Sequence, residues 1–79
     1  SNLFVDKRNK IDQALISEAF YQQFYHAMNI ISEPHREILI LFIFENKTYY
    51  EIASIQNISL GGVKSRLHRA RAAILKQLT

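Results

Sequence analysis

The stretch Thr48–Leu78, TYYEIASIQNISLGGVKSRLHRARAAILKQL, carries the strongest structural signals in this sequence of 79 residues. Thr48 opens it and Glu51 follows three residues later, which is the spacing of a capping box that satisfies two free amides at a helix start. Asn57 stands where this helix must end, because asparagine tolerates the left-handed conformation of a helix C-terminus. Ser59 is a favoured capping residue for a second helix. The stretch therefore predicts a short helix, a tight turn and a longer helix.

The longer helix has an apolar side and a basic side. At about 100° per residue, apolar residues at three- and four-residue steps fall on one stripe that faces the core. These residues are Leu60, Val63, Leu67, Ala70, Ile74 and Leu78, and the short helix adds Ile52, Ala53 and Ile55. The opposite side holds Ser65, Arg69, Ala72 and Lys76, flanked by Gly61, Arg66 and His68. Such a pair is typical of the helix-turn-helix that sets a recognition helix into the DNA major groove.

Charge separates the C-terminal segment from the rest of the chain. Residues 59–79 hold five Lys or Arg and no Asp or Glu, a net charge of +5, whereas residues 1–58 carry −2. A polyanionic partner is therefore attracted to the C-terminal helix rather than to the whole protein. This asymmetry, together with the spacing of the two helices, argues against a basic side that is merely solvated.

As a motif, T-Y-Y-E-I-A-x-I-x-N-I-S-L-G-G-V-K-S-R-L-H-R-A-R resembles region 4 of bacterial sigma factors, above all the small extracytoplasmic-function group. That group joins a T/S-Y-x-E-I-A helix to a V-x-T-V-K/R-S-R-L-x-R-A-R recognition helix. The resemblance covers residues 32–78, where Glu33–Leu39, EPHREIL, is similar to the family's L-P-x-x-x-R-E-x-L segment. Asn57 replaces the usual turn glycine, Gln56 a usual apolar residue and Gly62 a common threonine. None of these departures removes a charged contact.

The resemblance implies a function and a set of partners. It implies a module without enzymatic activity that binds the −35 element of duplex promoter DNA and directs transcription initiation. The absence of Cys suits a location in the reducing cytoplasm. The resemblance further implies docking on the flap of the RNA polymerase β subunit and sequestration by an anti-sigma factor. It assigns promoter contact to Lys64, Ser65, His68 and Arg69.

The chemistry of the basic helix is consistent with these roles. Arginine suits the paired acceptors of guanine, and serine and lysine reach base edges or phosphates. Arg66 and Arg71 are expected either to contact phosphates or to pair with Glu residues within the protein. The amides of Ser59, Leu60 and Gly61 are expected to bind a phosphate at the helix N-terminus. Tyr49 and Lys47 are candidates for contact with the DNA backbone from the short helix.

The N-terminal part predicts a linker followed by a long helix. Residues 1–9 show no sustained period and predict a linker or a remnant of cloning, and the missing initiator Met with Ser1-Asn2 predicts a fragment of a longer protein. Residues 10–79 form the expected domain. Residues 11–31 contain no Gly or Pro, and one helical stripe runs along them: Ile16, Phe20, Phe24, Ala27, Met28 and Ile31. Ile11, Ala14 and Leu15 fall on nearly the opposite side.

An apolar segment lies in the middle of the chain. Seven consecutive apolar residues, 38–44, fit a buried strand or a helix by periodicity alone. Pro34 at its start, and the absence of a partner strand, favour a helix to Glu45. We expect Ile38, Leu41 and Phe42 to face the core, while a neighbouring helix or a partner protein covers Ile40, Ile43 and Phe44. The aromatic set Phe20, Phe24, Phe42 and Phe44 is expected in the core, with an apolar groove for a partner helix as the alternative.

The fold class is therefore all-α, a small bundle of about four helices ending in a helix-turn-helix of the winged-helix-like or sigma region 4 type. With no Cys, and with His26, His35 and His68 at spacings unlike those of metal ligands, we expect no metal and no cofactor. Ser65 and His68 share a helical face, but no orienting group accompanies them as catalysis requires. The seven-residue apolar run is far below the roughly 20 residues needed to span a bilayer, so we expect no membrane partner.

Two alternative functions remain open at this point. One is the output domain of a response-regulator-type activator, which uses a similar helix-turn-helix. The other is a helical protein-interaction module that docks through Ile40, Ile43 and Phe44 while its basic side is only solvated.

Overall fold

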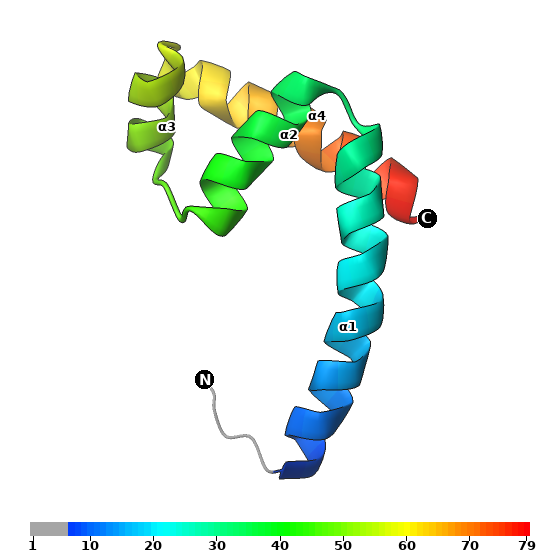
Figure 1. Ribbon diagram of the computed structural model, residues 1–79. Coiled ribbons are helices and arrows are strands. Elements are labelled where there is room, and N and C mark those ends of the chain that lie inside the picture. Colours follow the sequence, from blue (N-terminus) through cyan, green and yellow to red (C-terminus); the bar gives the residue numbers. More distant parts are fainter. Residues whose placement is uncertain (1–6) are drawn as a thin grey trace.

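The structure, a computed structural model, describes the backbone of residues 7–79 and the side chains of residues 18–79. Its elements are α1 (Lys7–Ile30), α2 (Glu33–Leu39), the π-helix η1 (Ile40–Phe44), α3 (Tyr49–Gln56) and α4 (Leu60–Leu78) (Figure 1). No strand occurs among the described residues, and the predicted all-α class with a terminal helix-turn-helix is confirmed. Of the linker expected over residues 1–9, residues 1–6 lie outside the described part and residues 7–9 belong to α1.

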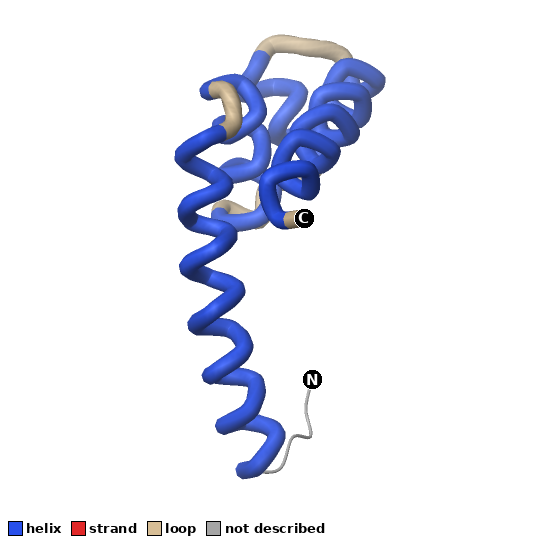
Figure 2. The backbone as a smooth tube through the Cα atoms, turned by 90° about the vertical axis from the view of Figure 1, so that its right-hand side faces the viewer, coloured by secondary structure: helices blue, strands red, loops and turns tan. Residues whose placement is uncertain are grey.

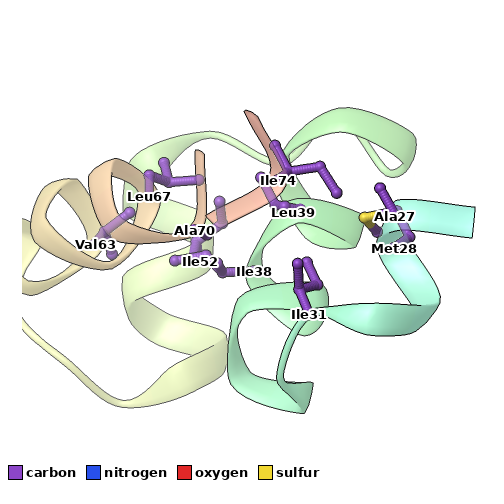
Figure 3. Packing of buried hydrophobic residues seen from close by; sticks show 10 residues of the cluster. All are labelled: Ala27, Met28, Ile31, Ile38, Leu39, Ile52, Val63, Leu67, Ala70 and Ile74. Atoms are coloured by element: carbon purple, nitrogen blue, oxygen red, sulfur yellow. The ribbon is translucent and has the colours of Figure 1, made fainter. Parts of the chain in front are cut away.

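A single aliphatic core joins all four α-helices. Side chains from the end of α1, from α2, from α3 and from α4 point toward one another in Figure 3. The buried residues are Ala27, Met28, Ile31, Ile38, Leu39, Ile52, Val63, Leu67, Ala70 and Ile74. Four of them come from α4, at the three- and four-residue steps that the sequence predicts. Leu60 and Leu78, at the two ends of that stripe, are half-buried. The recognition helix is thus held along its length by its apolar stripe.

Helix α1 contributes only its C-terminal end to this core. In both views its N-terminal half extends away from the other helices (Figures 1 and 2). The buried members of the predicted stripe are Ala27, Met28 and Ile31, and Phe24 is half-buried. Phe20 was expected in the core but is 51% exposed. It lies in the part of α1 that extends beyond α2 and α4, so these helices do not cover it. Ile16, Ile11, Ala14 and Leu15 lie outside the residues whose side chains are described.

The central apolar segment is helical, as predicted, but its second half is wound as a π-helix. The Glu45 amide donates to the Ile40 carbonyl at 3.0 Å, five residues back instead of four. This wider winding rotates the following side chains relative to an α-helix. Leu39 is buried, Leu41 is only half-buried, and Phe42, predicted to face inward, is 40% exposed. The prediction for Phe42 was wrong because it assumed the α period throughout.

Aromatic rings gather on the surface between α1 and η1. Phe20 and Phe24 stack with ring centroids 5.7 Å apart, and the Phe24 ring lies 6.1 Å from that of Phe44. Tyr21 and Tyr25 stack beside them at 6.5 Å. Of the four phenylalanines expected in the core, Phe24 packs against it, whereas Phe20, Phe42 and Phe44 are exposed, so the expectation was wrong for those three. Both tyrosines are exposed as well. We call Phe20, Tyr21, Phe24, Tyr25 and Phe44 the aromatic face.

One arginine closes the junction between α1 and α2. The Nε of Arg36 donates to the Met28 carbonyl at 2.7 Å, and its Nη2 donates to the Ile31 carbonyl at 2.8 Å. Carbonyls in the last turn of a helix have no partner within the helix, so these bonds satisfy two groups that would otherwise lack one. Arg36 thereby ties the start of α2 to the end of α1. No pattern in the sequence indicates this role.

Candidate nucleic-acid interface

The first helix of the pair begins with the predicted capping box. The Thr48 hydroxyl accepts from the Glu51 amide at 3.1 Å, and the Thr48 amide donates to the Glu51 carboxylate at 2.8 Å. This backbone bond from Thr48 lowers the pKa of Glu51 below its ordinary value, and the Thr48 side chain and Lys47 act in the same direction. Ile52, in the first turn after the cap, has no exposed surface. The cap therefore fixes where α3 starts on the core.

The turn between α3 and α4 is closed by backbone bonds. Asn57 adopts the left-handed conformation, φ 55° and ψ 50°, as predicted. Its amide donates to the Ser54 carbonyl at 3.3 Å, and the Ile58 amide donates to the Ala53 carbonyl at 3.0 Å. This pair of bonds is the Schellman motif. The correction here concerns Ile55, which was expected to face the core and is 55% exposed.

Ser59 caps the recognition helix α4, as the sequence predicts. Its hydroxyl accepts from the Gly62 amide at 3.0 Å. A Cβ on residue 62 would lie 3.3 Å from this oxygen, which is a tight contact, so glycine suits the position. Gly61 is exposed in the same first turn, where no helical carbonyl precedes the amides of Leu60 and Gly61. These amides point along the helix axis, away from the body of α4.

The side of α4 opposite its apolar stripe is exposed. Lys64, Ser65, His68 and Arg69 all lie there or on its near flank, and none is buried. Arg69 donates from Nη1 to the Ser65 hydroxyl oxygen at 2.7 Å. Residues four apart are neighbours on a helix surface, which is why this bond forms without bending the helix. The four residues with the most direct predicted role thus share one accessible surface.

A groove runs along one flank of α4. It is lined by Lys64, His68 and Arg71 on α4, by Tyr49 at the start of α3, and by the apolar side chains Leu39, Phe42, Ile43, Leu67 and Ile74. The Tyr49 ring packs against Phe42 with centroids 5.7 Å apart. The structure therefore brings Tyr49, Lys64, His68 and Arg71 to one groove, whose rim is basic and whose floor is apolar. Ser65 and Arg69 lie on the other side of Lys64, on the outer surface.

Arg66 differs from the other cations of α4. It is half-buried, and its Nη1 donates to Gln56 Oε1 at 3.3 Å, so it bridges α4 to α3. An intramolecular partner was one of its two predicted roles, but the partner is an amide and not a Glu. The signal was present in the sequence, since Gln56 replaces an apolar residue of the motif. A polar residue at that position needs a polar partner once it is partly buried.

Comparison with known proteins adds to this geometry. The profile described as "Sigma-70, region 4" matches residues 21–74, which include α2, η1, α3 and most of α4. The chain belongs to the sigma-70 region 4 family. This confirms the resemblance inferred from the sequence, and it favours that family over the output domain of a response regulator.

Two relatives of this region 4 chain come from Bacillus subtilis (strain 168). The ECF RNA polymerase sigma factor SigW is 38% identical over 48 residues, and the RNA polymerase sigma factor YlaC is 41% identical over 49. The matched part is 61% and 62% of this chain but only 26% and 28% of the two relatives. The chain thus spans about a quarter of the length of the relatives it matches. No solved structure gives a significant match.

Two further features of the region 4 chain concern alternative sites. Over the described residues, no helix is sufficiently long and apolar to cross a membrane. Nor do three or more His, Asp or Glu side chains within that same part gather where a metal ion could be held. The candidate surfaces on the described residues are the exposed side of α4, the groove beside it and the aromatic face.

Proposed function

We propose that this chain reads the −35 element of promoter DNA through α4 and so directs transcription initiation by RNA polymerase. In this proposal it acts as region 4 of an extracytoplasmic-function sigma factor, a non-enzymatic module of the cytoplasm. The observation that carries the proposal is the exposed basic side of α4, which lies opposite the buried residues Val63, Leu67, Ala70 and Ile74. Family membership, and the name of SigW as an ECF sigma factor, support the same function.

The roles of the side chains follow from their positions. Arg69, Ser65, Lys64 and His68 face the floor of the major groove, where base edges are read. Arg71 and Tyr49 lie in the groove beside α4 and contact phosphates of the DNA strand next to the major groove. The backbone amides of Ser59 and Gly61 bind a further phosphate at the N-terminus of α4. Arg66 is held by Gln56 and contributes mainly to the angle between α3 and α4.

The protein partners belong to a different surface. We place contact with the RNA polymerase β flap, and with an anti-sigma factor, on the exposed apolar side chains outside the basic side of α4. Phe44 is 53% exposed, does not line the groove beside α4 and belongs to the aromatic face. Contiguous exposed apolar patches mark interaction sites. This surface is also what the alternative function, a protein-interaction module, would use.

DNA binding is tested with a charge-matched pair of variants. Duplexes selected from a random library by the unaltered chain serve as the probe. Lys64→Ala with Arg69→Ala removes two charges from the exposed side of α4, and Lys7→Ala with Lys10→Ala removes two from the first turn of α1. We expect the first pair to lower affinity at least about 100-fold and the second pair less than about 3-fold, measured by fluorescence anisotropy.

Salt dependence provides a second readout of the same experiment. The cations of α4 lie near phosphates even where they read base edges, and with about four phosphates neutralised in this way log K should fall with log salt at a slope of about −3 to −4. Removing Lys64 and Arg69 should flatten the slope by about 1 to 2. Equal losses for both pairs would indicate attraction by net charge alone. Unchanged affinity for the α4 pair would overturn the proposal and favour the protein-interaction module.

A further inference from the structure

One hydrogen bond on the exposed side of α4 joins two side chains that the sequence predicts as separate DNA contacts. Arg69 Nη1 donates to Ser65 Oγ at 2.7 Å, which is short for a bond between a nitrogen and an oxygen. Both residues are exposed, and they lie on the side of α4 opposite Val63 and Ala70, which have no exposed surface. The bond therefore holds no part of the core together. What it fixes is the direction of the Arg69 guanidinium.

The chemistry of the guanidinium leaves its recognition edge free in this arrangement. An arginine carries five N–H donors, and the bond to Ser65 uses one of the two on Nη1. The edge formed by Nε and Nη2 keeps two parallel donors. That edge matches a pair of acceptors, such as O6 and N7 of a guanine or two phosphate oxygens. Ser65 can thus hold the side chain from one side while the other side binds.

The other cations of α4 lack this combination. Arg66 is held by Gln56 against α3 and is half-buried, so its head is directed away from the exposed side. Arg71 lies in the groove with Tyr49 and Phe42. Arg69 is therefore the arginine of α4 that is both exposed and oriented by a partner on its own helix.

Orientation matters because an exposed arginine samples many rotamers and loses that freedom when it binds. A bond already present in the free protein removes part of that loss. It also favours one orientation of the Arg69 guanidinium. A base pair that presents two neighbouring acceptors to its Nε and Nη2 donors is therefore bound better than a base pair that does not. The expected contribution of such preorganisation is about 2- to 10-fold in affinity.

We propose that Ser65 is a positioning residue, which sets the sequence preference of α4 at one base pair by orienting Arg69, and does not itself read a base. The proposal rests on the proposed DNA-binding function. It predicts that Ser65 acts only through Arg69. The consequence is that removing the serine hydroxyl has no effect once the arginine is absent.

The test is a double-mutant cycle on the selected duplex and on duplexes with each base pair replaced in turn. The variants are Ser65→Ala, Ser65→Thr, Arg69→Ala and the double variant Ser65→Ala with Arg69→Ala. All substitutions are at exposed positions, and circular dichroism checks that each variant keeps its helix content. We expect Ser65→Ala to lose about 2- to 10-fold in affinity and to lose discrimination mainly at the base pair where Arg69→Ala also loses it. Ser65→Thr, which keeps the hydroxyl, should bind like the unaltered chain.

The outcomes separate this inference from the function on which it rests. In the Arg69→Ala background, Ser65→Ala should change affinity by less than about 1.5-fold. If the two losses multiply instead, or if Ser65→Ala alters a different base pair, Ser65 contacts DNA independently and the positioning role is wrong while DNA binding stands. If Ser65→Ala has no effect while Arg69→Ala weakens binding, the role is likewise wrong. If neither variant alters binding, both the inference and the proposed reading surface fail.

Discussion

The two halves of this molecule are both helical, but their connections are closed in different ways. Between α3 and α4, the turn is closed by bonds that reach five residues or fewer, namely the backbone bonds around Asn57 and the cap at Ser59, and the longer bond from Arg66 to Gln56 adds to them. Between α1 and α2, the closing group is the side chain of Arg36, which reaches back five and eight residues. The turn between α3 and α4 is therefore determined mainly by residues that are close together in the sequence. The junction between α1 and α2 depends on the angle at which the two helices pack.

The two halves also differ in what they expose. The helix-turn-helix half presents the cations and small polar groups of α4, and its exposed large apolar residues, such as Tyr50, Ile55 and Leu75, do not stack on one another. The other half presents the aromatic face, with rings paired along α1 and across to Phe44. A polyanion and an apolar partner would therefore use separate surfaces. This separation allows both to bind at once, and it makes the two halves independently testable.

The largest expected effect contrasts a buried aliphatic residue with an exposed ring. Ile52 has no exposed surface, whereas Phe44 is 53% exposed. We expect Ile52→Ala to lower the free energy of unfolding by about 2 to 5 kcal/mol, because it leaves a cavity in the core. Phe44→Ala should cost less than about 1 kcal/mol, since much of its area is already in water. Urea denaturation followed by circular dichroism measures both.

A domain of this size is only marginally stable, so Ile52→Ala could leave it unfolded at room temperature. Ile52→Val keeps the comparison quantitative, with an expected loss of about 1 kcal/mol. A loss for Phe44→Ala as large as that for Ile52→Ala would contradict the contrast. Such a result would mean that the aromatic face contributes to the stability of the fold as much as a core residue does, and that binding a partner is not its main role.

The second prediction concerns the junction that Arg36 closes. Arg36→Met keeps the apolar stem but removes both donors, which leaves two carbonyls at the end of α1 without their partner. We expect a loss of about 2 kcal/mol in the free energy of unfolding. Arg71→Met, the same change at an exposed position, should alter stability by less than about 0.5 kcal/mol. DNA affinity of the Arg36 variant should be unchanged under conditions where it is folded, because α3 and α4 have their own closing bonds.

These contrasts explain which parts of the fold could be predicted from the sequence. The capping box, the left-handed Asn57 and the Ser59 cap were all predicted, because each depends on residues close together in the chain. The stripe of α4 was predicted because its period continues unbroken from Val63 to Ile74. The exposure of Ser65 and Arg69 follows from that stripe, since a helix that buries one side must expose the other.

Apart from Ile55 in α3, the wrong expectations concern the other half, and each of those has a physical cause. Phe42 was misplaced because nothing in an unbroken apolar run signals where α winding gives way to π winding. Phe20 was misplaced because its stripe is correct but the core ends before reaching it. The role of Arg36 could not be predicted, since it depends on the angle between two helices. The contact of Arg66 with Gln56 was predictable in part. The sequence shows a polar residue, Gln56, at a position that is usually apolar, but it does not show that Arg66 is its partner.

A third prediction compares two asparagines that both have a positive φ. Asn57 ends α3 at φ 55°, and Asn46 follows η1 at φ 54°. Alanine is disfavoured in this region by about 1 to 2 kcal/mol, so each Asn→Ala variant should lose about 1 kcal/mol of stability. Only Asn57→Ala should also weaken DNA binding, by about 3- to 10-fold, because it alone disturbs the angle between α3 and α4. Equal effects on binding would show that the turn has no special part in orienting the recognition helix.

The smallest expected effect concerns pH and the capping box of α3. Glu51 has a lowered pKa in the folded protein, chiefly because the Thr48 amide donates to its carboxylate. A group whose pKa is lower when folded contributes stability above its ordinary pKa, and that contribution is lost as the pH falls through the folded value. Glu51→Gln retains an oxygen acceptor but no longer titrates. Between about pH 5 and about pH 3, the free energy of unfolding should therefore fall more steeply for the unaltered chain than for Glu51→Gln. Every other carboxylate is common to the two proteins, so the difference between their curves isolates this one. Parallel curves would mean that the carboxylate is no better bound in the folded chain than in the unfolded one, and that the cap at Thr48 acts through its hydroxyl alone.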